Sequence, residues 1–125
     1  MSGQGLRSSR VASRVHEELA GLLRGMSDPR IAGVLISRVE MSDDLQVAKV
    51  FVRNEIGEAL SVAGRRSMLE GLEAAGGRLR REIAKSVDLR RVPTLRFLYD
   101  EGRDSAYRVE EILREIQADD RRGKQ

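Results

Sequence analysis

The chain has 125 residues, and its 23 Lys and Arg against 20 Asp and Glu give a net charge of +3. The absence of cysteine excludes disulfides and thiolate metal sites, and the single histidine, His16, argues against a histidine-based zinc site or a Ser–His catalytic pair. No apolar run approaches the roughly 20 residues of a membrane span, and no apolar signal core follows the N-terminus. We therefore expect one small, soluble, cytoplasmic domain without a cofactor or metal.

The first predicted element is a helix. Residues 1–7 lack periodicity, so we expect a disordered N-terminus there. From Ser8 onward the apolar residues recur at helical spacing. The predicted helix stops before Asp28-Pro29, because proline disfavours helical geometry in the residue that precedes it.

Two strands are predicted next, at residues 34–41 and 45–53. Between them, Ser42-Asp43-Asp44 has turn chemistry, since these side chains bond their own backbone. We therefore expect an antiparallel hairpin. On its first strand, alternation predicts one face with Leu35, Val39 and Met41, and an opposite face with Arg38 and Glu40.

A second helical pattern follows a loop at residues 54–63 and contains two adjacent glycines. Its apolar positions recur at steps of three and four straight across these glycines: Met68, Leu72, Ala75, Leu79 and Ile83. Each glycine weakens a helix by about 1 kcal/mol relative to alanine, so Gly76-Gly77 predicts a kink rather than a loop. Both halves of the helix then face the same sheet.

The last elements complete an α+β domain. Residues 87–93 form a connector, and residues 94–99 read as a third strand with Leu95 and Phe97 on one side. A final helix is predicted after Asp104 or Ser105. We expect a disordered segment at 1–7, one domain at 8–117 and a charged tail at 118–125. The order helix–strand–strand–helix–kink–helix–strand predicts a three-stranded sheet with helices on one face, as in KH domains of the second type.

The strongest local signal for function is the basic segment after the glycines. Between Gly76 and Arg96 there are seven Lys or Arg residues and two acids, so this segment is more positive than the whole chain. Arg78, Arg81 and Lys85 share one helical face. Free N–H groups, the helix dipole and mobile cations near a glycine break suit a phosphate backbone. The charges alone fit an ordinary solvated face equally well.

Several short blocks, taken in order, resemble the ribosome-binding factor A family. The blocks are Asp28-Pro29-Arg30-Ile31, residues 39–45, Ala48-Lys49-Val50, residues 75–80, residues 89–97 and Tyr99-Asp100. With the flanking helices they cover residues 7–113. The resemblance implies a single KH domain whose glycine-x-x-glycine loop is replaced by an alanine-x-glycine kink, here Ala75-Gly76-Gly77. The second glycine inside this kink departs slightly from the family pattern.

The resemblance also implies a function. Family members bind the small (30S) ribosomal subunit and its 16S rRNA, assist late rRNA processing and have no catalytic activity of their own. We therefore expect a monomeric, non-enzymatic assembly factor that does not contact membranes. Its predicted RNA-binding residues are Ala75, Gly76, Gly77, Arg78, Arg80, Arg81, Lys85, Arg90 and Arg91.

Two other functions compete with this one. A KH-type regulatory protein that binds single-stranded RNA is the closer alternative, but the chain has no glycine-x-x-glycine loop and few aromatic residues for stacking bases. A nuclease of rRNA precursors would need clustered acids or histidines, and the chain offers Asp43-Asp44. A turn explains these two acids better than a magnesium site does.

Three further arginines and the histidine have open roles. Arg7, Arg10 and Arg14 lie near the start of the first helix and fit either a second RNA contact or a solvated face. Arg14 is also placed to pair with Glu17 or Glu18. His16 lies just off the apolar stripe, and we expect a partly exposed helix residue rather than a catalytic group.

Overall fold

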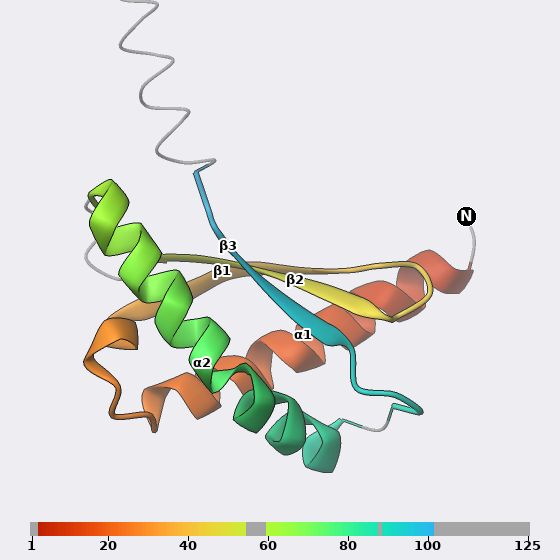
Figure 1. Cartoon of the computed structure of the whole chain (residues 1–125). Coiled ribbons are helices and arrows are strands. Elements are labelled where there is room, and N and C mark those ends of the chain that lie inside the picture. Colours follow the sequence, from red (N-terminus) through yellow and green to blue (C-terminus); the bar gives the residue numbers. More distant parts are fainter. Residues whose placement is uncertain (1–2, 55–59, 88, 102–125) are drawn as a thin grey trace, which may run out of the picture.

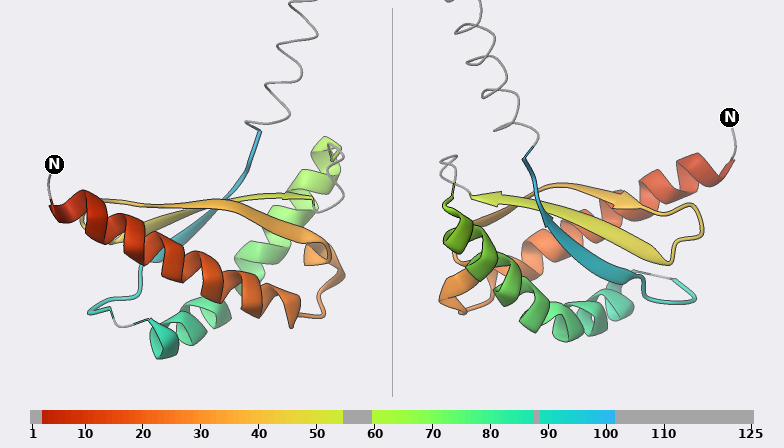
Figure 2. Two further views of the ribbon diagram at one scale, coloured as in Figure 1. Left: turned by 180° about the vertical axis from the view of Figure 1, so that it is seen from behind. Right: turned by 45° about the horizontal axis from the view of Figure 1, so that its top comes forward.

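Two helices pack against one face of a three-stranded sheet (Figure 1). The computed structural model describes residues 3–54, 60–87 and 89–101. The elements in chain order are helix α1 (Gly3–Arg24), the 3-10 turn η1 (Pro29–Ile31), strands β1 (Val34–Met41) and β2 (Val47–Asn54), helix α2 (Val62–Ser86) and strand β3 (Thr94–Tyr99). Two further views show that both helices lie on the same side of the sheet (Figure 2). The predicted α+β, KH-like arrangement is thus confirmed.

The ends of the elements lie close to the predicted ones: β2 is Val47–Asn54 where residues 45–53 were predicted, and α2 begins at Val62, inside the predicted loop at 54–63. Strands β1 and β3 have the predicted bounds. Helix α1 begins at Gly3, so the predicted disorder is wrong for residues 3–7. Periodicity detects the buried face of a helix, and extending an existing helix by a few residues needs no buried face. The predicted final helix and the tail at 118–125 lie outside the described residues.

The sheet has the order β1-β2-β3, with β1 and β2 antiparallel and β2 and β3 parallel. The predicted hairpin is therefore confirmed. A bulge between Ile36 and Arg38 shifts the register of β1 by one residue. An extra residue reverses the alternation, so Leu35 faces the same side as Arg38 and Glu40. The expectation that Leu35 shares a face with Val39 and Met41 is wrong for this reason.

The core lies between the helices and the sheet. The apolar stripe predicted for each helix faces inward, as do alternate residues of the strands. The fully buried side chains include Val15, Leu19, Val50, Val52, Leu72, Leu79 and Ile83. Aliphatic residues thus supply most of the core, and Phe97 is its buried aromatic residue among those described.

The turn η1 packs closely on α2 at Gly71. A Cβ atom at Gly71 would lie 2.8 Å from Ile31 Cγ2 and 2.9 Å from Arg30 Cβ, which is closer than side chains can approach. Asp28 caps the turn by accepting a 2.9 Å hydrogen bond from the Arg30 N–H, and its carboxylate lies 2.8 Å from the Arg30 guanidinium. These bonds, first from the Arg30 side chain and then from its backbone, hold the pKa of Asp28 below its ordinary value. Asp28-Pro29-Arg30-Ile31 therefore has a structural role.

Candidate nucleic-acid interface

Helix α2 runs without interruption through Gly76 and Gly77. Its N-terminus is capped by Ser61, which accepts a 3.0 Å hydrogen bond from the Gly64 N–H. Neither Gly76 nor Gly77 has a positive φ, and a Cβ atom at Gly76 would meet nothing within 4 Å. The axis of α2 changes direction along its length (Figures 1 and 2). The glycines are therefore not required for a turn or for close packing, and their effect on α2 is to weaken it locally.

The half of α2 after the glycines carries the predicted cationic face. We call Arg78, Arg81 and Lys85 the basic stripe; all three side chains are exposed, while Leu79 and Ile83 between them are fully buried. Lys85 Nζ lies 3.2 Å from Glu82 Oε1. Arg78 and Arg81 form no ion pair within residues 3–54, 60–87 and 89–101. Two of the three charges are thus available to an external anion.

Arg80 points elsewhere and has an internal role. Its Nε donates to the Pro93 carbonyl and its Nη2 to the Val92 carbonyl, both at 3.2 Å. Arg80 was predicted to bind RNA, and in the structure its guanidinium donors hold the connector that leads to β3. This role could not be read from spacing, because both partners are backbone atoms more than ten residues away.

Arg90 and Arg91 lie at a second place, in a cleft of about 470 Å³. The cleft is lined by Arg7, Asp43, Asp44, Leu45, Gln46, Leu89, Arg90 and Arg91. It brings the connector together with the β1–β2 turn and the start of α1. Of the three arginines near the start of α1, Arg7 joins this cluster, which the sequence did not predict. Among the described lining residues, three arginines against two aspartates give a net positive charge.

The turn at this cleft is held by Asp44. The carboxylate accepts a 2.6 Å bond from the Ser42 hydroxyl and a 3.1 Å bond from the Gln46 N–H. These two bonds hold the pKa of Asp44 below its ordinary value, so the carboxylate stays ionised. The turn interpretation is confirmed. No cluster of three metal-ligating side chains occurs in the part of the chain that the structure describes.

The other two α1 arginines differ from each other. Arg14 pairs with Glu17 and Glu18, each at 3.6 Å, and donates to the Ser86 carbonyl at 3.2 Å, so its charge serves the contact between α1 and the end of α2. Arg10 is exposed. The ion pairs expected for Arg14 are confirmed.

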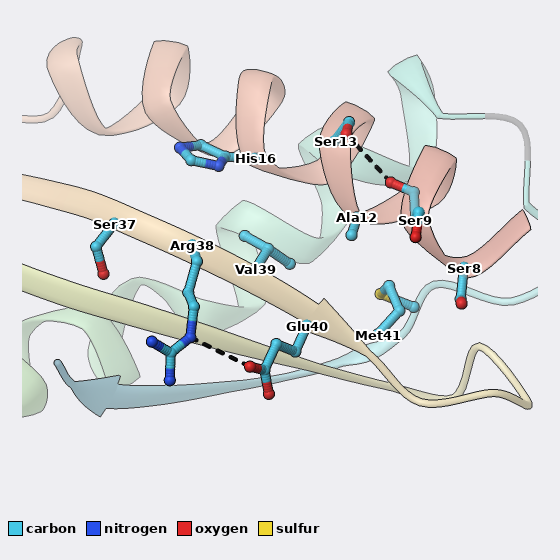
Figure 3. A pocket seen from close by; sticks show the side chains of 10 residues that line it. All are labelled: Ser8, Ser9, Ala12, Ser13, His16, Ser37, Arg38, Val39, Glu40 and Met41. Carbon is cyan, nitrogen blue, oxygen red and sulfur yellow. Dashed lines mark hydrogen bonds and ion pairs between the residues drawn. The ribbon is translucent and has the colours of Figure 1, made fainter. Parts of the chain in front are cut away.

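His16 lines a groove of about 420 Å³ between α1 and β1 (Figure 3). It is partly exposed, as predicted. Serines surround the groove, but Ser13 donates to the Ser9 carbonyl at 3.1 Å and Ser37 to Asp100. Among the described residues His16 makes no hydrogen bond to a serine.

The sequences of known proteins match this chain over most of its length. The family model for ribosome-binding factor A matches residues 7–113. The ribosome-binding factor A of Sorangium cellulosum is 62% identical over 116 residues, with 93% of each chain covered. The described helices include none that is long and apolar enough to cross a membrane.

Solved structures agree with this match. The crystal structure of ribosome-binding factor A from Thermus thermophilus is similar with a TM-score of 0.64 and 27% identity, over 74% of this chain and 93% of that one. A homology model of the Thermus thermophilus factor, fitted into the cryo-EM map of its complex with the 30S subunit, gives a TM-score of 0.56 and 28% identity. It covers 71% of this chain and 90% of that model. This chain therefore belongs to the ribosome-binding factor A family.

Proposed function

We propose that this protein binds the immature small ribosomal subunit through 16S rRNA and assists its late maturation and rRNA processing. The basic stripe would be the main contact, with Arg90 and Arg91 extending it. The observation that carries the proposal is an exposed cationic helix face on a chain of the ribosome-binding factor A family. A relative fitted in complex with the 30S subunit supports the same partner.

The placement of the stripe suits recognition of an RNA backbone. Leu79 and Ile83 are fully buried, so they fix the rotation of α2 and direct Arg78, Arg81 and Lys85 outward. Phosphate contacts position a protein on folded RNA without reading bases, and they need cations on a rigid element. The glycine-weakened point just before the stripe lets its direction differ from that of the first half of α2.

The mechanism that we propose is steric and conformational. The protein, acting as a cytoplasmic monomer without cofactor, holds one arrangement of rRNA until maturation is complete and then leaves. No bond is made or broken by the protein itself. The cleft at Arg90 and Arg91 would contact a neighbouring stretch of the same rRNA, because its net charge is also positive.

The test removes the stripe while keeping the core. Arg78→Ala, Arg81→Ala and Lys85→Ala together should leave thermal stability nearly unchanged, since surface substitutions usually stay within about 0.5 kcal/mol each. Co-sedimentation with free small subunits should weaken. Its log–log salt slope should become shallower by about 0.7 to 0.9 for each lost phosphate contact.

Leu79→Ala is the comparison variant. Leu79 is fully buried beside the stripe, so this change should cost about 2–5 kcal/mol of unfolding free energy. At a temperature where this variant is still folded, its subunit binding should stay near wild type. A folded triple variant that binds subunits at wild-type strength and with a wild-type salt slope would refute the proposal.

A further inference from the structure

The face of the sheet turned away from both helices carries side chains from all three strands. We call it the open face; Figure 2 shows that neither helix covers it. Alternation of burial and the strand register assign to it Leu35, Arg38, Glu40, Lys49, Phe51, Arg53, Arg96 and Leu98. Leu35 and Leu98 are exposed by 36% and 39%. The face therefore combines apolar groups with cations.

Its centre is a stacked pair of an arginine and an aromatic ring. The Arg38 guanidinium lies 3.9 Å from the centre of the Phe51 ring. Phe51 pairs with Arg38 on β1 and with Leu98 on β3, so the three side chains form one row across the sheet. Aromatic rings and guanidinium planes are the surfaces on which unpaired RNA bases stack. Arg38 is held in place by Glu40, at 3.2 Å, and by Asp100, at 3.8 Å.

The neighbouring row supplies free cations. Lys49 and Arg96 are partners across the parallel pair, and both are exposed. Neither forms an ion pair or hydrogen bond within the part of the chain that the structure describes. Two adjacent unpaired cations beside a stacking platform are complementary to a nucleotide, which has a base and a phosphate a few ångströms apart. An acidic protein surface would use the cations but not the platform.

We infer that the open face binds a single-stranded RNA segment. A base stacks on the row formed by Arg38, Phe51 and Leu98, and the adjoining phosphates contact Lys49 and Arg96. The inference rests on the proposed function only in taking RNA as the partner. Because α2 lies on the other side of the sheet, the open face and the basic stripe would hold two separate RNA segments at once.

The first experiment measures binding of the full chain to fluorescein-labelled 12-nucleotide RNAs, adenine-only and uracil-only, by fluorescence anisotropy. Lys49→Ala with Arg96→Ala should weaken binding at least about fivefold and lower the salt slope by about 1.4, since single strands contribute about 0.7 per phosphate. The matched control is Arg24→Ala with Arg66→Ala, which removes the same charge from exposed helix positions. The control should change binding less than twofold.

The second experiment tests the platform. Phe51→Leu keeps an apolar side chain but removes the ring, and it should weaken adenine-RNA binding about fivefold or more, with a smaller effect on uracil-RNA, because adenine stacks better. In the wild-type protein, adenine-RNA should shift the NMR signals of Phe51 and Leu98. If Phe51→Leu does not fold, the NMR shifts of the wild-type protein and the RNA affinity of the Lys49–Arg96 variant decide whether RNA binds the open face.

The outcomes separate this inference from the proposed function. If the Lys49–Arg96 variant binds RNA and subunits like wild type while the stripe variant loses subunit binding, the open face is not an RNA site and the proposed function stands. If the Lys49–Arg96 variant loses subunit binding but keeps RNA binding, its partner is a protein and the inference is overturned. If neither variant affects any binding, both ideas fail.

Discussion

Three glycines in the middle of helix α2, Gly71, Gly76 and Gly77, serve two opposite purposes. Gly71 lies against η1, where a Cβ atom would overlap Ile31 and Arg30 at 2.8 and 2.9 Å. Gly76 has nothing within 4 Å of its Cβ position, and a Cβ at Gly77 would meet Arg81 Nη1 at an ordinary 3.6 Å. One glycine thus lets two elements touch, and the other two leave the helix locally weak. The first half of α2 is fixed by its contact with η1, and the weak point before Arg78 lets the second half, which packs through Leu79 and Ile83, take a different direction.

Among the changes that test this comparison, Gly71→Ala should have the largest effect. Overpacking a filled site costs about 1–3 kcal/mol, and better helix propensity returns about 1 kcal/mol of that. Taking the upper end of the overpacking range, we expect the free energy of unfolding to fall by about 2 kcal/mol, as measured by urea denaturation. Ser67→Ala, a small change one turn earlier on α2, serves as the control. A Gly71→Ala protein as stable as wild type would show that η1 can move away and that the contact is not tight.

Gly76→Ala with Gly77→Ala should act in the opposite direction. Neither residue has a positive φ and both Cβ positions are open, so each change should stabilise the helix by about 0.5–1 kcal/mol. A stiffer α2 would carry Arg78 and Arg81 to a different angle. We therefore expect higher stability and weaker co-sedimentation with small subunits. Unchanged subunit binding in the stabilised protein would mean that the weak point has no part in recognition.

The smallest effect concerns the acid that holds η1 against Gly71. Because the folded-state pKa of Asp28 is lowered, its contribution to stability is present above the ordinary carboxyl pKa, about 3.9. The contribution is lost as pH falls through the lowered value. The urea midpoint should therefore drop between pH 6 and pH 3.

Asp28→Asn should show a smaller drop over the same range. Asparagine keeps an oxygen for the Arg30 N–H but has no charge to lose. Asp44, whose pKa is also lowered, leaves some pH dependence in the variant. An equal drop in both proteins would show that the Asp28–Arg30 bonds do not stabilise the fold.

Much of the fold could be predicted, because most of it depends on local signals. Strands β1 and β3 alternate and are flanked by turn residues, and the stripe from Met68 to Ile83 continues across the glycines, so these elements were correct. The bulge near Ser37 was missed because an extra residue leaves no mark in composition. The face of Leu35 was wrong as a direct result. The start of α1 was missed because its first residues show no apolar periodicity in the sequence.

The candidate site was predicted in part for the same reason. Helical spacing was enough to place Arg78, Arg81 and Lys85 together on an exposed face. Whether that face binds RNA stays a prediction. The gathering of Arg7 with the connector, and of Lys49 with Arg96, depends on strand register and on a loop path, which no local pattern encodes. The place of Phe51 on the open face likewise follows only from the sheet.

The bonds of Arg80 have a consequence for how this chain can vary. Arg80 donates to the carbonyl oxygens of Val92 and Pro93, and every residue type carries a backbone carbonyl. Substitutions at position 92 therefore leave the tether intact, while Arg80→Lys loses it, because one ammonium cannot reproduce the fork of guanidinium donors. Pro93 is fully buried and Val92 packs against the core, so the connector positions that can diversify at little structural risk are the exposed Arg90 and Arg91, as long as Arg80 is kept.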